Sequence, residues 1–427
     1  SDVITRPAHP YTEGLLRAMP AMDGTRGRLI PIKGEIPPPD KLGSGCPFAS
    51  RCPRVTNACR ESLGAMTAVE DGRRRTRCDA ALLTAAPHAP SCASRLASLP
   101  VQDTEFPVIS DIRIARHCYV SRQGLLGRRR PWDVLQDIDL QVRSGEVMGL
   151  VGESGCGKST FARTLLGLYA KTGGSIAYKG RDIADRAVGR DYRRHVQMIF
   201  QDPYASLDPR MTVEDIISEP LRNYHLCQDD SQRRQRVASL LEQVDMRPEA
   251  AQRYPHEFSG GQRQRIGIAR ALAVDPECVF CDEPISALDV SVQVQIVNMM
   301  QRLQQERGLS YLFIAHDLAM VHHMSRRMGV MYLGRLVELG PGDAVFHDPL
   351  HPYTQMLIAS VPRPDPHYRR RTIVCGEVPS PLDLPKGCVF HPRCPYADEV
   401  CRIDVPHFRQ VADDRFVACH HARGGRR

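Results

Sequence analysis

A stretch of eight residues, Gly152-Glu-Ser-Gly-Cys-Gly-Lys-Ser159, has the residue types and the spacing needed to bind a polyphosphate. It fits the pattern G-x-x-x-x-G-K-[ST] of a phosphate-binding loop. Its glycines permit a sharp turn in which backbone N–H groups face the phosphates. Lys158 would reach the β- and γ-phosphates, and the Ser159 hydroxyl would ligate Mg²⁺ beside phosphate oxygens. The residues expected to hold a nucleotide here are Gly152, Glu153, Ser154, Gly155, Cys156, Gly157, Lys158, Ser159 and Thr160.

The segments on either side of this loop are those that a phosphate cradle requires. Residues 146–151 form a short apolar run typical of a buried strand, and residues 159–169 carry apolar side chains at helical spacing. In this order, the loop amides and the helix N-terminus point at the phosphates. The alternative is a glycine-rich turn with an incidental Lys-Ser pair. Such a turn would not require a buried strand before it and a helix after it, so these flanking segments favour a phosphate-binding loop.

A second apolar segment, residues 277–282, ends in two adjacent carboxylates, Asp282 and Glu283. Ligands gather at the carboxyl ends of parallel strands. Asp282 could therefore hold Mg²⁺ through water, while Glu283 polarises an attacking water molecule. On its own, Asp-Glu-Pro is an ordinary turn at the end of a strand. After a phosphate-binding loop, it indicates hydrolysis of a nucleoside triphosphate.

Four further motifs follow in a fixed order. They are Gln201, Phe258-Ser-Gly-Gly-Gln262, Ser286-Ala-Leu-Asp289, and His316 after an apolar segment. With the loop and the paired carboxylates, this series resembles the ATP-binding cassette (ABC) family over about residues 106–345. The resemblance implies an α/β fold, namely a P-loop NTPase of the ABC nucleotide-binding type with a helical subdomain that carries the signature loop. Phe258 stands where the family more often has Leu.

The resemblance also assigns roles to these residues. Gln201 would sense Mg²⁺ and contact the membrane subunits, and His316 would contact the γ-phosphate. The implied catalytic residues are Glu283, His316, Lys158 and Gln201, and the implied Mg²⁺ ligands are Ser159, Gln201 and Asp282. The implied nucleotide contacts outside the phosphate-binding loop are Ser259, Gly260, Gly261, Gln262 and Asp289.

The signature loop has a physical logic of its own. Ser259, Gly260 and Gly261 precede an amphipathic helix over residues 264–273, which provides a second helix N-terminus suited to anions. Because the chain already has one complete phosphate cradle, this second one predicts an ATP bound between two cassettes. The active unit should therefore be a dimer of ATPase domains.

An aromatic residue upstream of the phosphate-binding loop stacks on adenine in this family. Tyr119 is the best-placed candidate, and Trp132 is the alternative. Either residue could instead fill a half-buried strand.

Composition limits the class of protein. The chain of 427 residues is long enough for two or three domains, and 42% hydrophobic content can fill a sizeable core. Neither an apolar run of membrane-spanning length nor a leader pattern is visible, which predicts a soluble cytoplasmic polypeptide. The net charge of +8 comes with dispersed arginine runs that lack interleaved aromatics. These runs fit solvated loops, or weak attraction to a membrane surface, rather than a nucleic-acid site.

An internal repeat links the two ends of the sequence. His9-Pro-Tyr-Thr12 recurs 342 positions later as His351-Pro-Tyr-Thr354, and Gly45–Pro53 recurs as Gly387–Pro395 in the pattern G-C-x-F-x-x-R-C-P. Both patterns resemble the C-terminal extension of ATPase subunits from oligopeptide and dipeptide importers, a branch that includes nickel importers. The fold prediction therefore includes small Cys-rich C-terminal extensions.

The repeat predicts the domain order. Residues 1–86 would be the Cys-rich extension of a first cassette whose body is absent, and residues 87–105 a linker. Residues 106–345 would be the ABC ATPase domain, with its helical subdomain at about 205–260, and residues 346–427 the second extension. The alternative for the first segment is an N-terminal module that works alone.

Eight cysteines form two sets with nearly equal spacing. The sets are Cys46, Cys52, Cys59 and Cys78, and Cys388, Cys394, Cys401 and Cys419. In a reducing compartment, clustered thiols more often bind metal than form disulfides. Four thiolates suit a [4Fe–4S] cluster or Zn²⁺, and free thiols are the third possibility. The spacing lacks the C-x₂-C pairs of common zinc ribbons, and some importers of this branch carry an iron–sulfur cluster in this extension. Nearby His391, His420 and His421 could substitute as ligands.

The resemblance implies an ATPase subunit that powers import of peptides by closure of two cassettes on ATP and Mg²⁺. The implied partners are a second ABC ATPase domain, two membrane permease subunits docked near Gln201 and, indirectly, an extracytoplasmic solute-binding protein; nucleic acid is not expected. The protein would lie peripherally at the cytoplasmic face of the cell membrane. Nickel or another small solute is the alternative substrate. A soluble non-transport ABC ATPase and a non-catalytic regulatory cassette are the alternative classes.

Overall fold

The computed structural model describes most of the chain as two compact units. The described residues are 2–20, 28–34, 37, 42–69, 74–78, 108–122, 129–362 and 376–422, of which 2, 108, 109, 114–122 and 129–132 are described by backbone only. The larger unit comprises residues 104–288, 299–361 and 371–427, and the smaller comprises residues 1–103, 289–298 and 362–370. The expected linker, residues 87–105, lies outside the described residues.

One mixed sheet forms the centre of the larger unit. Its strands, in spatial order, are β13 (Arg409–Ala412), β14 (Arg415–Val417), β12 (Arg335–Pro341), β11 (Arg327–Tyr332), β5 (Val147–Val151), β10 (Ser310–Ile314), β9 (Cys278–Asp282) and β8 (Val196–Ile199). From β11 to β8, neighbouring strands run parallel. Every residue of β5, β9 and β10 is buried, as expected for parallel strands covered on both faces.

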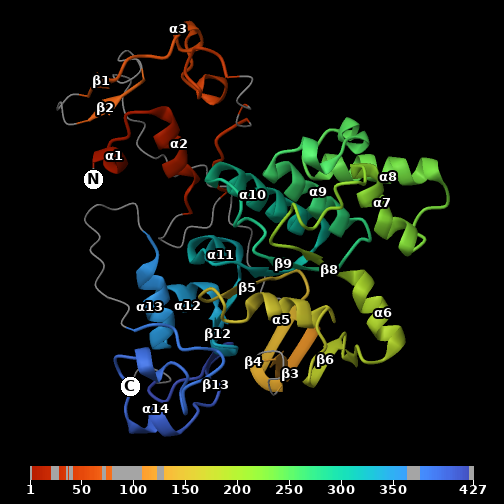
Figure 1. Cartoon of the computed structure of the whole chain (residues 1–427), viewed down its shortest axis with the longest axis vertical. Coiled ribbons are helices and arrows are strands. Elements are labelled where there is room, and N and C mark those ends of the chain that lie inside the picture. Colours follow the sequence, from red (N-terminus) through yellow and green to blue (C-terminus); the bar gives the residue numbers. More distant parts are fainter. Residues whose placement is uncertain are drawn as a thin grey trace. The chain divides into compact units, whose positions relative to one another are not determined.

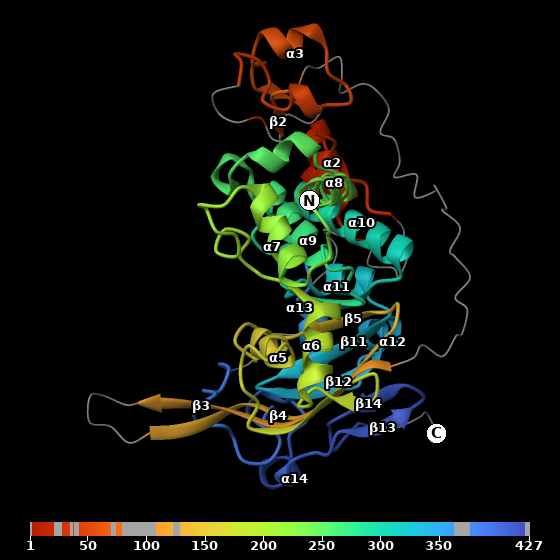
Figure 2. The same ribbon diagram turned by 90° about the vertical axis from the view of Figure 1, so that its right-hand side faces the viewer.

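A second, antiparallel sheet packs against the first. Its strands, in spatial order, are β4 (Arg129–Arg143), β3 (Val108–Arg122), β6 (Gly173–Tyr178) and β7 (Arg181–Asp182). Figure 2 shows the long β3–β4 ribbon extending from this unit. One apolar core joins both sheets to helix α5 (Lys158–Leu165), with Leu140 from β4, Leu150 from β5 and Phe161 from α5. This core fixes the strand and the helix on either side of the phosphate-binding loop.

Helices between β8 and β9 form a subdomain, drawn in lime and green in Figure 1. They are α7 (Val213–Asn223), α8 (Asp230–Gln243), η3 (Pro248–Gln252), η4 (Pro255–Glu257) and α9 (Gly260–Leu272). The three α-helices each begin at a side chain that accepts a backbone N–H, namely Thr212, Asp229 and Ser259. The signature motif thus lies at the start of α9.

Four other helices lie between or after strands of the larger unit. They are α6 (Arg186–His195), α10 (Val290–Arg307), α11 (Leu318–Met324) and α12 (Gly342–His347). α6 connects β7 of the second sheet to β8 of the central sheet. In the described part of the chain, no helix has both the length and the apolar character needed to cross a membrane.

The C-terminal segment is built onto the same central sheet. It contains α13 (Pro352–Ser360), η5 (His391–Arg393), α14 (Glu399–Ile403) and the strands β13 and β14. β14 pairs antiparallel with β12, with Glu338 opposite Val417 and Leu339 opposite Phe416. This segment is therefore continuous with the sheet that carries the phosphate-binding loop.

The smaller unit repeats the local structure of that segment. It contains α1 (Asp2–Thr5), α2 (Pro10–Ala18), η2 (Ala49–Arg51), α3 (Asn57–Glu61), β1 (Thr67–Ala68) and β2 (Arg75–Thr76). α2, η2 and α3 begin 342 positions before α13, η5 and α14. Equivalent hydrogen bonds close equivalent turns: the Cys46 N–H donates to the Cys59 carbonyl at 2.7 Å, and the Cys388 N–H to the Cys401 carbonyl at 2.8 Å. The sequence repeat is thus also a structural repeat.

Candidate nucleotide site

The phosphate-binding loop joins β5 to α5 and has the backbone that its glycines were expected to permit. Gly155 and Gly157 adopt φ of 78° and 105°, in the left-handed region that favours glycine. A Cβ at Gly152 would meet the carbonyl oxygen of Met331 at 2.2 Å, so no larger residue fits there. Gly157 precedes α5 without a side-chain cap, which leaves the first helical amides available to an anion.

Lys158 and Ser159, at the start of α5, hold the loop together and reach the neighbouring strand. The buried Lys158 Nζ donates to the carbonyl oxygens of Gly152 and Glu153, at 2.8 and 2.9 Å. The Ser159 hydroxyl donates to Asp282 Oδ1 at 2.7 Å. The predicted Mg²⁺ ligands Ser159 and Asp282 are therefore in direct contact.

Asp282 ends β9 and is fully buried. Burial raises the pKa of its carboxyl, and the hydrogen bond from Ser159 opposes that effect. Its Oδ2 accepts no hydrogen bond from the described residues and lies 3.9 Å from the Arg163 guanidinium. A buried carboxylate oxygen beside a serine hydroxyl is a donor set that suits Mg²⁺, which binds to few protein oxygens and keeps water ligands.

Gln201, Glu283 and His316 meet at one edge of the central sheet. Gln201 Nε2 donates to Glu283 Oε2 at 3.0 Å, and His316 Nδ1 lies 3.4 Å from the same oxygen. Glu283 has a positive φ of 47°, and its N–H donates to the Ile314 carbonyl at 2.8 Å. The strained backbone of Glu283 and its hydrogen bond to β10 together fix the position of this carboxylate.

A cavity of about 250 Å³ extends from the phosphate-binding loop to Gln201 and Glu283. It is lined by the phosphate-binding loop, by Gln201 and Glu283, by two residues of β4 and by two residues of the C-terminal segment. Those lining residues include Ser154, Gly155, Cys156, Gly157, Lys158, Ser159, Thr160, Asp133, Val134, Pro381 and Leu384. Of the predicted loop residues, Gly152 and Glu153 are absent from this described lining. The Glu153 backbone N–H donates to the Tyr353 hydroxyl, and its carboxylate pairs with Arg393. Neither partner carries a signal in the sequence around the loop.

The signature loop is placed differently. Ser259 and Gln262 form a capping box, in which each side chain accepts the other residue's backbone N–H, at 3.3 and 3.0 Å. Residues 259–262 are absent from the described lining of the cavity. Asp289 caps α10 by accepting from Ser291 N and Val292 N. The chain's own signature loop therefore does not line the described part of its own phosphate pocket.

The adenine candidates lie on the β3–β4 ribbon. Tyr119 and Trp132 occupy opposite positions in its ladder. Their side chains lie outside the described part of the structure, and the choice between them stays a prediction.

The eight repeat cysteines form two groups. Cys46, Cys52, Cys59 and Cys78 all line one cavity of about 250 Å³ in the smaller unit. In the larger unit, burial and, to a smaller extent, the proximity of Cys401, Cys419 and Cys394 raise the pKa of Cys388 to about 11. His421 Nε2 lies 3.5 Å from Cys401 Sγ. The described cysteines form no disulfide.

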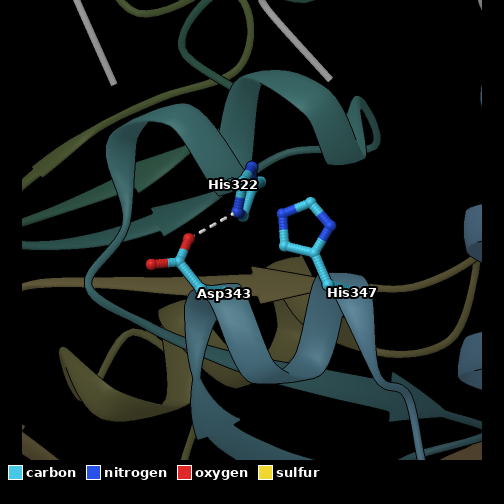
Figure 3. A group of neighbouring side chains, drawn as sticks. All are labelled: His322, Asp343 and His347. Carbon is cyan, nitrogen blue, oxygen red and sulfur yellow. Dashed lines mark hydrogen bonds and ion pairs between the residues drawn. The ribbon is translucent and has the colours of Figure 1, made fainter. Parts of the chain in front are cut away.

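A group that the sequence did not indicate joins α11 to α12. Figure 3 shows His322 pointing at Asp343, with Nε2 and Oδ1 2.8 Å apart, and His347 beside them. The His322 ring stacks on Phe346 with centroids 4.2 Å apart. Asp343 and His347 lie four residues apart on one helix, but His322 comes from a distant segment. Because α11 begins two residues after His316, this group helps to hold the segment that carries His316.

The central sheet has parallel strands that carry a phosphate-binding loop and, on β9, paired carboxylates, and a separate helical subdomain carries the signature motif. Together these features define an ABC-type ATPase. Comparison with family models agrees. A model described as "ABC transporter" matches residues 135–286, and one described as "Oligopeptide/dipeptide transporter, C-terminal region" matches residues 1–59 and 337–401.

Curated relatives give the branch of the family. The oligopeptide transport ATP-binding protein AppF of Bacillus subtilis is 48% identical over 320 residues, 73% of this chain and 97% of the relative. The oligopeptide transport ATP-binding protein OppF of Salmonella typhimurium is 50% identical over 298 residues, 69% and 89% of the two chains. The di/tripeptide transport ATP-binding protein DppF of Pseudomonas aeruginosa is 47% identical over 314 residues, 72% and 96%. The chain therefore belongs to the oligopeptide and dipeptide branch of ABC transporter ATP-binding proteins, as its motifs predicted.

Proposed function

We propose that this chain binds and hydrolyses ATP to power the import of peptides across the cytoplasmic membrane. The observation that carries the proposal is the contact of Gln201, Glu283 and His316 at the edge of the sheet, beside an intact phosphate-binding loop. Relatives named for oligopeptide and di/tripeptide transport, at about half identity, support peptide as the cargo.

The chemistry follows from the charges around the cavity. MgATP supplies the phosphoryl group and the metal charge that lowers the barrier to its transfer. The loop amides and Lys158 hold the phosphates, and Ser159 with Asp282 would hold Mg²⁺. Glu283 accepts the proton of the attacking water, while Gln201 and His316 fix the position of its carboxylate. Catalysis is then chiefly positioning and electrostatic stabilisation.

A second cassette completes the site. Residues 259–262 of one cassette present a helix N-terminus that would close on the nucleotide of another, which gives an ATP-bound dimer. Two membrane permease subunits, docked near Gln201, would convert closure and reopening into alternating access. A solute-binding protein outside the membrane would deliver the peptide. The chain would then act at the cytoplasmic face of the membrane as a peripheral subunit.

Each Cys-rich segment would hold one [4Fe–4S] cluster, with zinc as the alternative. Each set has four thiols, the number that either metal group binds. Near the second set, Asp398, Cys401 and His421 have ligand atoms within 4.8 Å of one another. A cluster would stabilise a segment that has little apolar core of its own.

The test is peptide uptake by proteoliposomes that contain this chain, its permease subunits and a second ATPase domain. ATP-dependent uptake of a labelled oligopeptide is expected. Glu283→Gln should retain ATP binding and lower hydrolysis by about 10²–10⁴-fold, because it removes the general base. Lys158→Ala should instead lose nucleotide binding. Normal turnover in Glu283→Gln would show that Glu283 is not the general base. ATP-driven uptake of nickel but not of peptide would show that nickel is the transported substrate.

A further inference from the structure

The C-terminal segment forms hydrogen bonds to Glu153 of the phosphate-binding loop. The Tyr353 hydroxyl, from α13, accepts the Glu153 backbone N–H at 2.8 Å. Arg393, from η5, forms two parallel hydrogen bonds to the Glu153 carboxylate, Nη1 to Oε2 at 2.7 Å and Nη2 to Oε1 at 3.0 Å. Two-point Arg–carboxylate pairs of this kind are strong and fix orientation.

The third polar group of Glu153 faces the reaction site. Its carbonyl oxygen accepts from the Nζ of Lys158 at 2.9 Å. The amide and the carboxylate are thus bound by the C-terminal segment, while the carbonyl holds the ammonium group proposed to bind the phosphates. A shift of Glu153 would move a partner of Lys158.

We infer that Arg393 and Tyr353 are positioning residues of the ATP site, which hold the phosphate-binding loop in its binding conformation through Glu153. The inference rests on the proposed function, because ATP is the ligand whose affinity it explains. The same segment also contributes Pro381 and Leu384 to the lining of the nucleotide cavity.

The surroundings of Arg393 fit a fixed contact rather than a surface ion pair. Arg393 is only 6% exposed, and its guanidinium lies over the rings of Tyr332 and Phe390, with the centroids 5.8 and 5.9 Å away. A charge in such a place is costly unless it is paired. Tyr353 is fully buried against the same two rings. Glu153 therefore has partners whose own positions are fixed by packing.

The position of Arg393 also depends on the cysteine group. Arg393 precedes Cys394 directly, and the His391 N–H, from the same short helix, donates to the Cys388 carbonyl at 2.9 Å. The turn between these two cysteines therefore carries the arginine that orients the phosphate-binding loop. Any change in the cysteine group that alters this turn should move Arg393. Glu153 would then shift, and its hydrogen bond to Lys158 would change.

The test is the equilibrium Kd of the purified full chain for a non-hydrolysable MgATP analogue. Arg393→Gln should raise Kd about tenfold or more, the scale of a lost charge-assisted hydrogen bond. Arg393→Lys should recover part of the affinity, since it keeps the charge but loses the second bond. Tyr353→Phe removes one hydroxyl without changing the packed volume and should raise Kd about threefold. Hydrolysis at saturating ATP should change much less than Kd, as expected when uniform binding is lost.

Two controls separate positioning from general stability. Tyr11→Phe changes the exposed tyrosine of the first segment that is equivalent to Tyr353, and it should leave Kd unchanged. Glu153→Gln combined with Arg393→Gln should bind no more weakly than the worse single variant, because both act through one contact. Kd values within twofold of the wild type for both Arg393→Gln and Tyr353→Phe would overturn the inference, as would full additivity of the pair. A wild-type chain that fails to bind the analogue would instead refute the proposed function.

Discussion

The two Cys-rich segments have one local fold but different surroundings. In each, a histidine caps a short helix by accepting the N–H of a tyrosine two residues on, His9 from Tyr11 and His351 from Tyr353, both at 3.0 Å. Tyr11 is 41% exposed, whereas Tyr353 is fully buried. In the second segment, β14 extends the central sheet and the segment contacts the phosphate-binding loop.

The difference separates the residues that specify the local fold of a segment from those that contact the cassette. The histidine caps and the cysteine turns recur in both segments, so they specify the local fold. The tyrosine hydroxyl and the arginine guanidinium meet Glu153 only in the second segment, so their function there lies in contact with the cassette. The first segment thus acts as an internal reference: matched substitutions should alter the ATP site only when they are made in the second segment.

The largest contrast should come from the two equivalent phenylalanines. Phe390 is 1% exposed and contacts the rings of Tyr332, Tyr353 and His351, whereas Phe48 contacts only Tyr11 and His9 among rings of the described residues. Phe390→Ala should lower the unfolding free energy of the larger unit by about 3–5 kcal/mol, through lost burial and a cavity.

The measurement is urea unfolding followed by the fluorescence of Trp132, the sole tryptophan, which belongs to the larger unit. Phe48 is itself only 9% exposed, but it belongs to the smaller unit, so Phe48→Ala should change the free energy reported by Trp132 by less than about 0.5 kcal/mol. An equal loss in both variants would mean that the two segments are not independent.

A smaller contrast should appear in the pH dependence of stability. Burial lowers the pKa of His351 to about 3, and its neutral Nδ1 accepts the Tyr353 N–H. The unfolded chain, with a histidine pKa near 6.5, binds a proton that the folded chain rejects. Stability is therefore full above about pH 6.5 and falls by about 1.4 kcal/mol per pH unit below it, until pH 3.

The check is the unfolding free energy reported by Trp132 at pH 7.5 and 5. His351→Asn keeps a side chain that can cap α13 and should remove about 2 kcal/mol of the loss between the two pH values. Burial raises the pKa of Glu338, so this carboxyl also contributes to the pH dependence. Comparing the loss of unfolding free energy in wild type and variant separates the contribution of His351 from that of Glu338. His9→Asn should leave this transition unchanged. Identical pH profiles for wild type and His351→Asn would refute the assignment.

The parts of the site that could be predicted from sequence are those fixed by local geometry or by strand order. The phosphate-binding loop is contiguous, so its glycines and Lys158 could be placed directly. Gln201, Glu283 and His316 each follow a parallel strand, and such strands bring their carboxyl ends to one edge. Their contact follows from fold class without knowledge of any side-chain packing.

The contacts of Glu153 could not be predicted in this way. Arg393 lies 240 residues away and Tyr353 lies 200 residues away, with no periodicity that links them to the loop. Their meeting depends on β14, a strand of three residues that is too short to give a sequence pattern but that attaches the segment to β12. Burial of the segment against the cassette, not its local sequence, decides which polar groups meet.

The smallest contrast compares the loss of one equivalent cysteine from each segment. It tests whether ATP affinity depends on the cysteine group of the second segment alone. Cys388→Ser and Cys46→Ser replace equivalent thiols, and each should lower iron and acid-labile sulfide by about four atoms per chain if each segment holds a [4Fe–4S] cluster. Only Cys388→Ser should weaken binding of the MgATP analogue, by about tenfold or less, because only its turn positions the arginine that pairs with Glu153. With Arg393→Gln already present, Cys388→Ser should add little. Equal loss of ATP affinity in the two single variants would show that cluster loss acts through general stability, and an unchanged affinity in both would separate the cysteine group from the ATP site.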